Sequence, residues 1–340
     1  MTVTLADLET LPSFALLGPG FSGDPAGFVL LEGLREATRA DPLLVFAPFE
    51  TDVPPTTFAA ERVTPCGVEL DHAEAPEFTV ELDAFGHREK VERIREAIAA
   101  GDVYQVCLTL RALVRGATGA SLFSRMCEWN IPRFAAWVRL PSGDEFVSAS
   151  PELFFETDGA YVHTEPMKGT ASPDAGGALE ASEKDRAELA MITDLLRNDL
   201  APVCLPKTIQ VPHERRVIEL PYALQTVSDV VGMLDAGATP LDVLRALHPG
   251  GSVTGAPKRA ALSMIRELEP EPRRAYCGTL GLWTGSRSVF SLLIRTAFRT
   301  PSAWVYGVGG GIVFDSDPAA ELEELHVKLG ALRCRTRFSR

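Results

Sequence analysis

The 340-residue sequence has few cysteines, and they form no recognisable pattern. No two of them make a CxxC pair, so neither a zinc site nor a disulfide framework is indicated. Two of them lie in apolar, strand-like runs, and we expect these two, Cys107 and Cys277, to pack in the core. The six cysteines are Cys66, Cys107, Cys127, Cys204, Cys277 and Cys334.

The sequence also lacks long apolar runs and an excess of positive charge. No run of 18 apolar residues occurs, and no basic segment followed by an apolar stretch begins the chain, so we expect a cytoplasmic protein. The net charge of −13 and the absence of a basic stripe argue against non-specific nucleic-acid binding. An acidic protein that binds an anionic metabolite must gather positive charge locally, from Arg, Lys, a metal ion or helix N-termini.

The order of the predicted elements indicates the fold class. Strands and helices mix without a regular βαβ alternation, which favours an α/β (α+β) fold with a mixed or antiparallel sheet and helices outside. Strands are expected at residues 28–31, 43–46, 103–114, 135–140, 145–155 with a break at 150–151, 278–283, 289–298 and 303–308. Helices are expected around residues 91–100, 182–200, 240–247 and 256–268, and after Asp317-Pro318.

Two of the expected helices carry pairs of acids one turn apart. Asp185 and Glu188 form one pair, and Glu321 and Glu324 form the other, with Lys328 on the same face as the second pair. Carboxylates from two helices suit Mg²⁺, which takes few protein ligands and keeps waters or substrate oxygens. A helix cap at Asp185 and an ordinary ion pair between Glu324 and Lys328 explain the same spacing, so the residues alone leave both readings open. The apolar face of the first of these helices is expected to carry Ala187, Met191 and Leu195.

Lys168 follows an apolar strand pattern and precedes Gly169 and Thr170 in an expected turn. A lysine nucleophile must be partly neutral, whereas free lysine titrates near ~10.4, and most lysines are simply solvated. Arg295 ends an apolar run and is expected to meet a carboxylate, either internal or from a ligand.

Taken in order, a series of short blocks resembles the chorismate-utilising enzymes. The blocks are residues 101–106, Ser150-Pro151-Glu152, Lys168-Gly169-Thr170, 184–188, 194–200, 249–258, Ile294-Arg295-Thr296, and 309–317 with Glu321, Glu324 and Lys328. The resemblance covers about residues 85–335 of an expected single chorismate-binding domain, 1–340, whose N-terminal part, 1–84, is shortened. It implies a fold in which large mixed or antiparallel sheets pack as a sandwich with helices outside.

Three positions within these blocks distinguish members of that family, and one of them, the segment 249–258, is more similar to aminodeoxychorismate synthases than to anthranilate synthases. Gln105 stands where the water-adding members carry a lysine, and so is similar to the ammonia-using members. Lys168 stands where anthranilate synthases have alanine, and is similar to the lysine of aminodeoxychorismate synthases. The resemblance therefore implies Mg²⁺-dependent amination of chorismate at C4 to 4-amino-4-deoxychorismate, for p-aminobenzoate and folate biosynthesis.

The resemblance also implies a role for each site residue. Lys168 would attack C2 of chorismate while the C4 hydroxyl leaves, ammonia would then add at C4 and expel the lysine, and Glu152 would be the general acid/base. Glu188 and Glu324, with Asp185 and Glu321 near them, would hold Mg²⁺. The remaining substrate-binding positions implied are Tyr276, Arg295, Gly310, Gly311, Lys328, Thr254, Gly169 and Thr170.

Three expectations complete the sequence-based hypothesis. No cysteine lies in a strand-turn-helix elbow between glycines, so we expect ammonia to come from a separate glutamine amidotransferase subunit. The alternative activity is that of anthranilate synthase component I, which aminates chorismate at C2. A second alternative is a homologue that binds chorismate with little or no turnover, because Leu224 lies just before Val227-Ser228, in a segment where the family usually carries a histidine.

Overall fold

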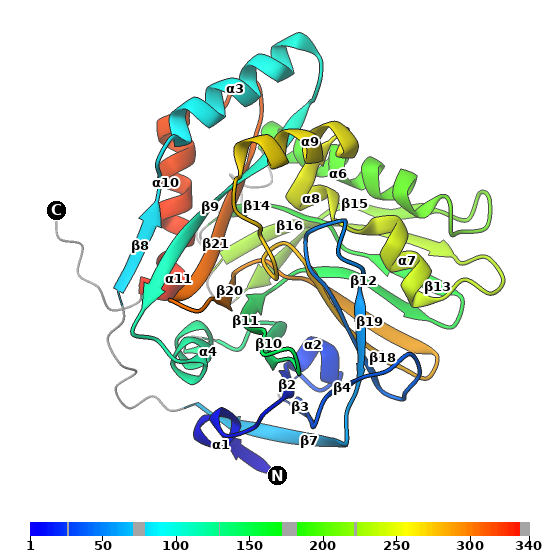
Figure 1. The fold of residues 1–340 in the computed structure, drawn as a ribbon. Coiled ribbons are helices and arrows are strands. Elements are labelled where there is room, and N and C mark those ends of the chain that lie inside the picture. The colour runs from blue at the N-terminus through cyan, green and yellow to red at the C-terminus, as the bar shows by residue number, and fades with distance from the viewer. Residues whose placement is uncertain (26, 71–78, 129, 172–181, 221–222, 334–340) are drawn as a thin grey trace.

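The computed structural model describes residues 1–25, 27–70, 79–128, 130–171, 182–220 and 223–333 (Figure 1). Its strands form one 11-stranded and one 10-stranded sheet. Within the described residues every strand pairing is antiparallel except that between β1 and β7. The predicted fold class, large mixed or antiparallel sheets with helices outside, is confirmed.

The first sheet has the order β1 (Thr2–Thr4), β7 (Arg62–Glu69), β3 (Phe28–Glu32), β2 (Phe14–Leu17), β10 (Phe134–Arg139), β11 (Glu145–Ser150), β20 (Thr296–Arg299), β21 (Trp304–Ile312), β9 (Gln105–Arg115) and β17 (Gly255–Ala256), and β8 (Thr79–Asp83) also pairs with β9. The second has the order β14 (Met167–Ala171), β16 (Ala223–Met233), β13 (Tyr161–Thr164), β12 (Leu153–Asp158), β19 (Arg287–Leu292), β18 (Thr279–Thr284), β5 (Leu43–Ala47), β6 (Thr56–Ala59) and β4 (Arg35–Glu36), and β15 (Gln210–Leu220) pairs with β16.

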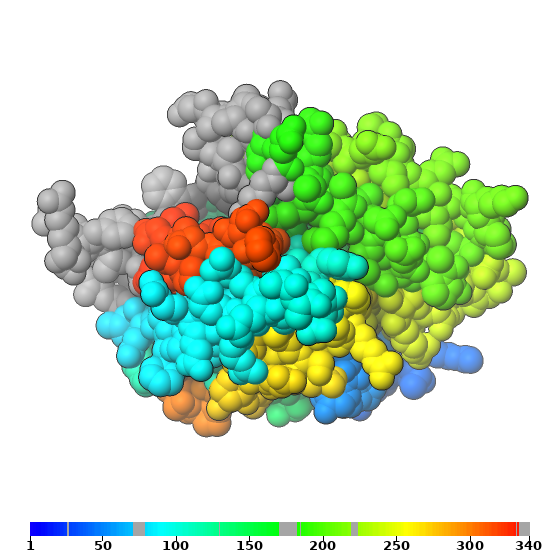
Figure 2. All heavy atoms as spheres, turned by 90° about the horizontal axis from the view of Figure 1, so that it is seen from above, coloured from blue at the N-terminus to red at the C-terminus, as the bar shows by residue number. Residues whose placement is uncertain are grey.

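Helices cover the outer faces of both sheets. Figure 2 shows the cyan α3 lying between the orange-red α10 and the yellow segment that includes α9. Helix α6 packs on β14 and β16 of the second sheet and against α7. The helices are α1 (Leu5–Glu9), α2 (Pro19–Ser22), α3 (His87–Ala100), α4 (Gly119–Cys127), α6 (Glu183–Leu200), α7 (Pro240–Leu247), α8 (Gly251–Thr254), α9 (Lys258–Leu268), α10 (Pro318–Lys328) and α11 (Gly330–Arg333). Among the described residues, none of these helices is long and apolar enough to cross a membrane.

The two sheets pack face to face over one continuous apolar core. The ring of Phe46 in β5 stacks on that of Phe146 in β11 with centroids 5.0 Å apart, so side chains of both sheets meet there. A second apolar core covers the other face of the 11-stranded sheet, beneath α1, α4, α10 and α11. Strand β10 contributes to both cores by alternation, with Ala136 in the first and Trp137 in the second.

Local sequence signals explain several element boundaries. The Ser182 hydroxyl accepts a hydrogen bond from the backbone of Asp185 and begins α6, and the Asp317 carboxylate caps α10 in the same way. Gly101, with φ of 83°, ends α3 in the left-handed conformation that glycine favours. The expected burial of Cys107 and Cys277 is confirmed.

Three expectations about elements are wrong. The apolar run 289–298 is two strands, β19 and β20, separated at residues 293–295. The helix expected from residue 256 begins at Lys258, because residues 255–256 pair with β9 as β17. In α6 the buried apolar side chains are Leu189, Ile192, Leu196 and Leu200. Of the expected face, Met191 and Leu195 are only partly buried and Ala187 is exposed.

Candidate active site

Two of the predicted site residues lie where the chain crosses from one sheet to the other. Glu152 joins β11 of the first sheet to β12 of the second, and Arg295 joins β19 of the second sheet to β20 of the first. The crossings are hydrogen-bonded to each other, because the Glu152 carbonyl accepts from the Ser291 hydroxyl at 3.1 Å and the Arg295 carbonyl accepts from the Ala149 backbone N–H at 3.0 Å. Arg295 was expected at the end of an apolar strand. It lies instead between two strands, in a turn with φ of 50°.

The Glu152 side chain is held in a buried, polar environment. Its side chain is 6% exposed, and its Oε1 accepts a hydrogen bond from the Ser252 hydroxyl at 3.2 Å. Burial raises the pKa of Glu152 to about 7, and the nearby positive charge of Lys168 opposes that rise. A carboxyl group with a pKa near the working pH can both donate and accept a proton, which suits a general acid/base.

A bulge in an edge strand sets the position of Lys168. In β14, Lys168 lies opposite Thr226 and Thr170 lies opposite Gln225, so Gly169 is the extra residue, and its φ of 68° is the conformation that such bulges require. The expected turn is thus a bulged strand. The Lys168 Nζ lies 3.6 Å from the Glu188 Oε2 on α6. The Thr170 side chain is outside the described part of the structure.

The glycine run 309–311 lies within β21 and not in a turn. Gly309 and Gly311 pair with Thr109 and Cys107 of β9. A Cβ added to Gly311 would lie 2.2 Å from the Gln105 Nε2, so glycine makes room there for a buried amide. Neither polar atom of the Gln105 side chain makes a hydrogen bond, although the side chain is fully buried. A buried amide without partners suits a group that binds a ligand.

Other predicted substrate-binding residues surround the same part of β21. The Lys328 Nζ donates to the Gly309 carbonyl at 2.7 Å, and the Tyr276 hydroxyl oxygen would lie 3.2 Å from a Cβ added to Gly309. A Cβ added to Gly310 would lie 3.4 Å from the Glu321 carboxylate. Thr254 is fully buried, and its hydroxyl donates to the Gly250 carbonyl at 2.9 Å within the short α8 segment.

Electrostatic effects indicate that these groups converge. Beside the dominant effect of burial, the charges of Lys168 and Arg295 both act on the pKa of Glu152. Those of Lys168 and Lys328 both act on the pKa of the Cys107 thiol, which burial raises. The lysines of β14 and α10 are therefore close enough to influence the same interior groups. This gathers positive charge locally in a protein whose net charge is −13.

Three of the four predicted metal ligands face a lysine or a serine. Glu188 pairs with Lys168, Glu324 pairs with Lys328 at 2.7 Å, and the Ser316 hydroxyl donates to the Glu321 Oε1 at 2.6 Å. Within the described residues, no three of Asp185, Glu188, Glu321 and Glu324 have carboxylate oxygens all within 4.8 Å of one another. Their oxygen ligands suit Mg²⁺ chemically, and the magnesium site stays a prediction.

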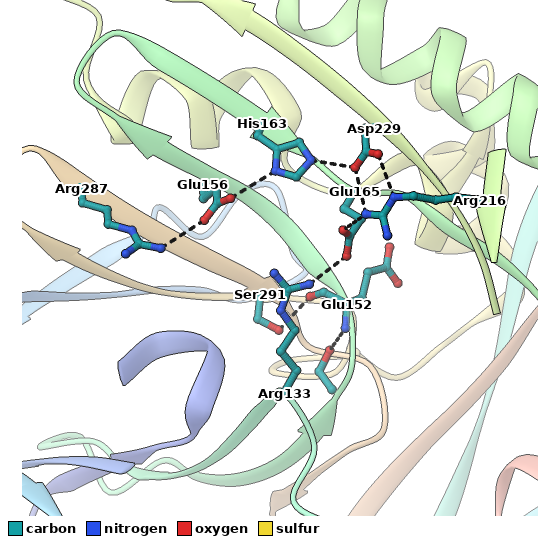
Figure 3. A network of polar contacts seen from close by, with 10 residues as sticks. Arg133, Glu152, Glu156, His163, Glu165, Arg216, Asp229, Arg287 and Ser291 are labelled. Atoms are coloured by element: carbon teal, nitrogen blue, oxygen red, sulfur yellow. Dashed lines mark hydrogen bonds and ion pairs between the residues drawn. The ribbon is translucent and has the colours of Figure 1, made fainter. Parts of the chain in front are cut away.

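A polar network beside Glu152 was not anticipated from the sequence (Figure 3). Arg216 donates to both Asp229 oxygens, at 2.8 and 3.0 Å, and also pairs with Glu165. His163 lies between Asp229, at 3.0 Å, and Glu156, at 3.2 Å. The Arg216 hydrogen bonds lower the pKa of Asp229 to about 2.

His163, Glu165 and Asp229 have ligand atoms close enough to hold a metal ion, but an arginine already occupies this position. Arg216 bonds both carboxylates, so a cation would have to displace a fully charged guanidinium. We therefore interpret the network as structural. The sequence signal for it is a charged residue in an apolar strand, as in Val227-Ser228-Asp229-Val230-Val231.

Comparison with known proteins identifies the family of this chain. Residues 52–333 match the family model described as chorismate binding enzyme. The chain belongs to the chorismate-binding enzyme family. It is 37% identical over 255 residues to aminodeoxychorismate synthase component 1 of Salmonella typhimurium, covering 72% of this chain and 56% of that protein. It is 38% identical over 259 residues to anthranilate synthase component 1 of Streptomyces coelicolor, covering 73% and 50%. The chain thus spans about half the length of these curated relatives.

Solved structures of two isochorismate synthases share the fold of this family member. The menaquinone-specific enzyme MenF of Escherichia coli matches with a TM-score of 0.83 at 18% identity, over 97% of this chain and 90% of that chain. A structure described as the 2,3-dihydroxybenzoate-specific enzyme DhbC of Bacillus anthracis matches with a TM-score of 0.81 at 23% identity, over 96% and 98%. At these identities the likeness concerns the fold alone.

Proposed function

We propose that this chain aminates chorismate at C4 with ammonia and produces 4-amino-4-deoxychorismate. The observation that carries the proposal is the position of Lys168 relative to Glu152. The charge of Lys168 acts on a buried carboxyl group whose pKa is about 7, which supports a site in which Lys168 is the nucleophile and Glu152 the proton donor. The similarity to aminodeoxychorismate synthase component 1 supports the same reaction.

The proposed chemistry uses this pair of side chains in two steps. The neutral Lys168 amine forms a bond to C2 of chorismate, the ring double bonds shift, and the C4–O bond breaks as Glu152 protonates the leaving hydroxyl, which departs as water. Ammonia then forms a bond to C4, the double bonds shift back, and the C2–N bond to Lys168 breaks. The amino group therefore remains at C4.

The two carboxylates of the substrate need separate positive partners. The backbone N–H groups near Gly310 and Gly311, with Arg295 and Tyr276, are proposed to bind the enolpyruvyl carboxylate. Burial lowers the pKa of Arg295, so a carboxylate ligand would offset the cost of its desolvated charge. Mg²⁺ held by Glu188 and Glu324 would supply positive charge to the ring carboxylate.

Ammonia is proposed to come from a separate glutamine amidotransferase subunit. The unbonded amide of Gln105 lies beside Gly311, where a neutral donor and acceptor could receive ammonia or a substrate hydroxyl. A free ammonium salt should replace the partner subunit in vitro, because ammonia itself is the reacting species.

Amination at C2 is the second candidate, supported by the 38% identity to anthranilate synthase component 1. Incubation with chorismate, Mg²⁺ and ammonium separates the two. Product that aminodeoxychorismate lyase converts to p-aminobenzoate supports amination at C4, whereas direct anthranilate fluorescence contradicts it.

The role of Lys168 can be tested in the same assay. Lys168→Ala should abolish efficient C4 amination, and mass spectrometry of wild-type protein quenched during turnover should find the substrate adduct on the peptide containing Lys168. Lys90→Ala on α3, a lysine with no proposed role in the site, is the control and should keep wild-type activity. Near-normal aminodeoxychorismate output from Lys168→Ala would exclude the covalent role.

A further inference from the structure

One edge of β9 has a gap between two partner strands. Along its first edge β9 pairs with β21 from Val106 to Val114. Along its second edge it pairs with β17 at Gln105 and Val106, and with β8 only from Arg111 onwards. In the described residues no strand covers the second edge at 107–110. The backbone polar groups that point to this edge need other partners, because the segment is buried.

A buried ion pair fills this gap. The Arg273 Nη2 donates to the Cys107 carbonyl at 2.8 Å, and the Glu269 Oε1 accepts from the Thr109 backbone N–H at 2.8 Å. A neighbouring antiparallel strand would present one N–H and one C=O to such a pair of groups. Arg273 and Glu269 present the same donor and acceptor from side chains, and so take the place of these two backbone groups of the missing strand.

The geometry of the pair leaves it little freedom to move. Arg273 donates to both Glu269 oxygens, from Nε at 2.7 Å and from Nη2 at 2.6 Å, and the two side chains are 3% and 8% exposed. Glu269 also accepts from the Thr109 hydroxyl at 2.8 Å. The Arg273 guanidinium carbon lies 4.3 Å from the centroid of the Phe49 ring. Bidentate pairing fixes the direction as well as the distance of the guanidinium.

The pair joins three segments of the candidate site. Cys107 and Thr109 lie directly opposite Gly311 and Gly309 of β21. The Arg273 Nη1 donates to the Val253 carbonyl at 2.7 Å, next to Ser252, whose hydroxyl bonds Glu152. Three residues after Arg273, the backbone N–H of Tyr276 bonds the Arg273 carbonyl at 3.0 Å.

We propose that Arg273 and Glu269 are positioning residues that hold the β21 backbone in register with the Ser252–Glu152 segment, so that both ends of the substrate are bound in one geometry. The inference rests on the proposed function, because it assigns β21 to a substrate carboxylate and Glu152 to proton transfer. Neither residue of the pair is itself proposed to touch the substrate.

The test must separate positioning from simple stability. Arg273→Met leaves the Glu269 carboxylate buried without its cation, which is strongly destabilising. The double variant Arg273→Met/Glu269→Gln removes that unpaired charge while Gln can still accept from Thr109, so thermal stability should recover in part. The Cys107 and Val253 carbonyls remain without their donor. Chorismate KM should therefore stay raised by about tenfold or more in the double variant, with a smaller change in kcat.

Two further measurements sharpen this test. Arg273→Lys, which keeps the charge but has one donor nitrogen in place of the guanidinium fork, should give an intermediate KM. Hydrogen exchange of the β21 amides, residues 304–312, should be faster in the double variant. The control is Arg111→Met/Glu271→Gln, which removes a partly exposed ion pair with N···O of 3.2 Å between Arg111 of β9 and Glu271. It should change neither the chorismate KM nor the exchange of the β21 amides.

Each outcome decides whether the Arg273–Glu269 pair positions the site or only stabilises the fold. A KM that returns to the wild-type value as stability recovers, or unchanged exchange of the β21 amides, would overturn the proposal. If wild-type protein does not turn over chorismate with ammonium, the proposed function fails instead. The exchange measurement then still decides whether the pair holds β21.

Discussion

Replacing Glu152 by Gln should stabilise the folded protein at alkaline pH while removing its proton donor. Burial raises the pKa of Glu152 to about 7 from its ordinary value of 4.5. The folded state therefore binds this proton more tightly than the unfolded chain does. The resulting stability is fully present below pH 4.5 and is lost as the pH rises through 7.

The size of the effect follows from the same values. The difference between 4.5 and about 7 corresponds to about 3 kcal/mol of unfolding free energy, because each pKa unit is worth about 1.4 kcal/mol. A neutral amide escapes this loss, and its carbonyl oxygen can still accept the Ser252 hydrogen bond. Glu152→Gln should therefore gain up to about 3 kcal/mol over wild type at pH 8 and little below pH 4.5, while kcat falls by about 10²–10⁴-fold.

The assay is urea denaturation of both proteins at intervals from pH 4 to pH 8. Glu156→Gln is a control whose stability should change with pH in the opposite direction. The hydrogen bond between Glu156 and His163 lowers the pKa of Glu156. The stability from Glu156 is present above its ordinary pKa and is lost as the pH falls, so this variant should lose stability relative to wild type at pH 7. A difference between Glu152→Gln and wild type that does not change with pH would refute the reasoning.

Three further predictions concern the metal site, the polar network and the bulge. Glu324→Gln should raise the Mg²⁺ concentration needed for half-maximal turnover at least about tenfold, whereas Glu323→Gln on the same helix should not. Asp229→Asn should lower the unfolding free energy at pH 7 by about 3 kcal/mol, because it leaves Arg216 without its forked partner, and denaturation at pH 7 measures this. Since the pKa of Asp229 is about 2, that loss should shrink only as the pH falls from 3.8 through 2. Gly169→Ala should cost about 1 kcal/mol or more at its φ of 68° and should lower C4 amination, measured by coupled p-aminobenzoate release. Unchanged amination in that variant would mean that the bulge does not position Lys168.

Regular apolar periodicity and local Gly and Pro residues predict much of this fold. The apolar spacing of Val91, Ile94 and Ile98 and the stop at Gly101 predict α3, and Pro151 predicts the break between β11 and β12. These elements are predictable because their signals lie within a few residues of the features they specify. The resemblance to the blocks of known enzymes also predicted the family, and the match to the family model confirms it.

The break between β19 and β20 has no comparable local signal. Residues 289–298 contain neither Gly nor Pro, and the left-handed turn at Arg295 is imposed by pairing with two different sheets. The polar network around Arg216 could not be predicted for the same reason, because Arg216 and Glu165 are brought together only by pairing of strands that are far apart in sequence. The role of the Arg273–Glu269 pair cannot be predicted from the sequence for a different reason. The pair fills a gap in the pairing along one edge of β9, and that gap exists only once the sheet is formed.

The sheet crossings explain why opposite charges at this site are shifted in opposite directions. A strand that leaves one sheet for the other must turn between them, and here both crossings are flanked by buried residues, Ser150 and Leu153 at one and Leu293 and Thr296 at the other. Burial raises the pKa of Glu152 and lowers that of Arg295, because it penalises the charged form of each group. A substrate carboxylate would favour the charged form of Arg295, whereas protonated Glu152 would be the proton donor that departure of a hydroxyl needs. The same desolvation therefore favours anion binding at one crossing and proton donation at the other.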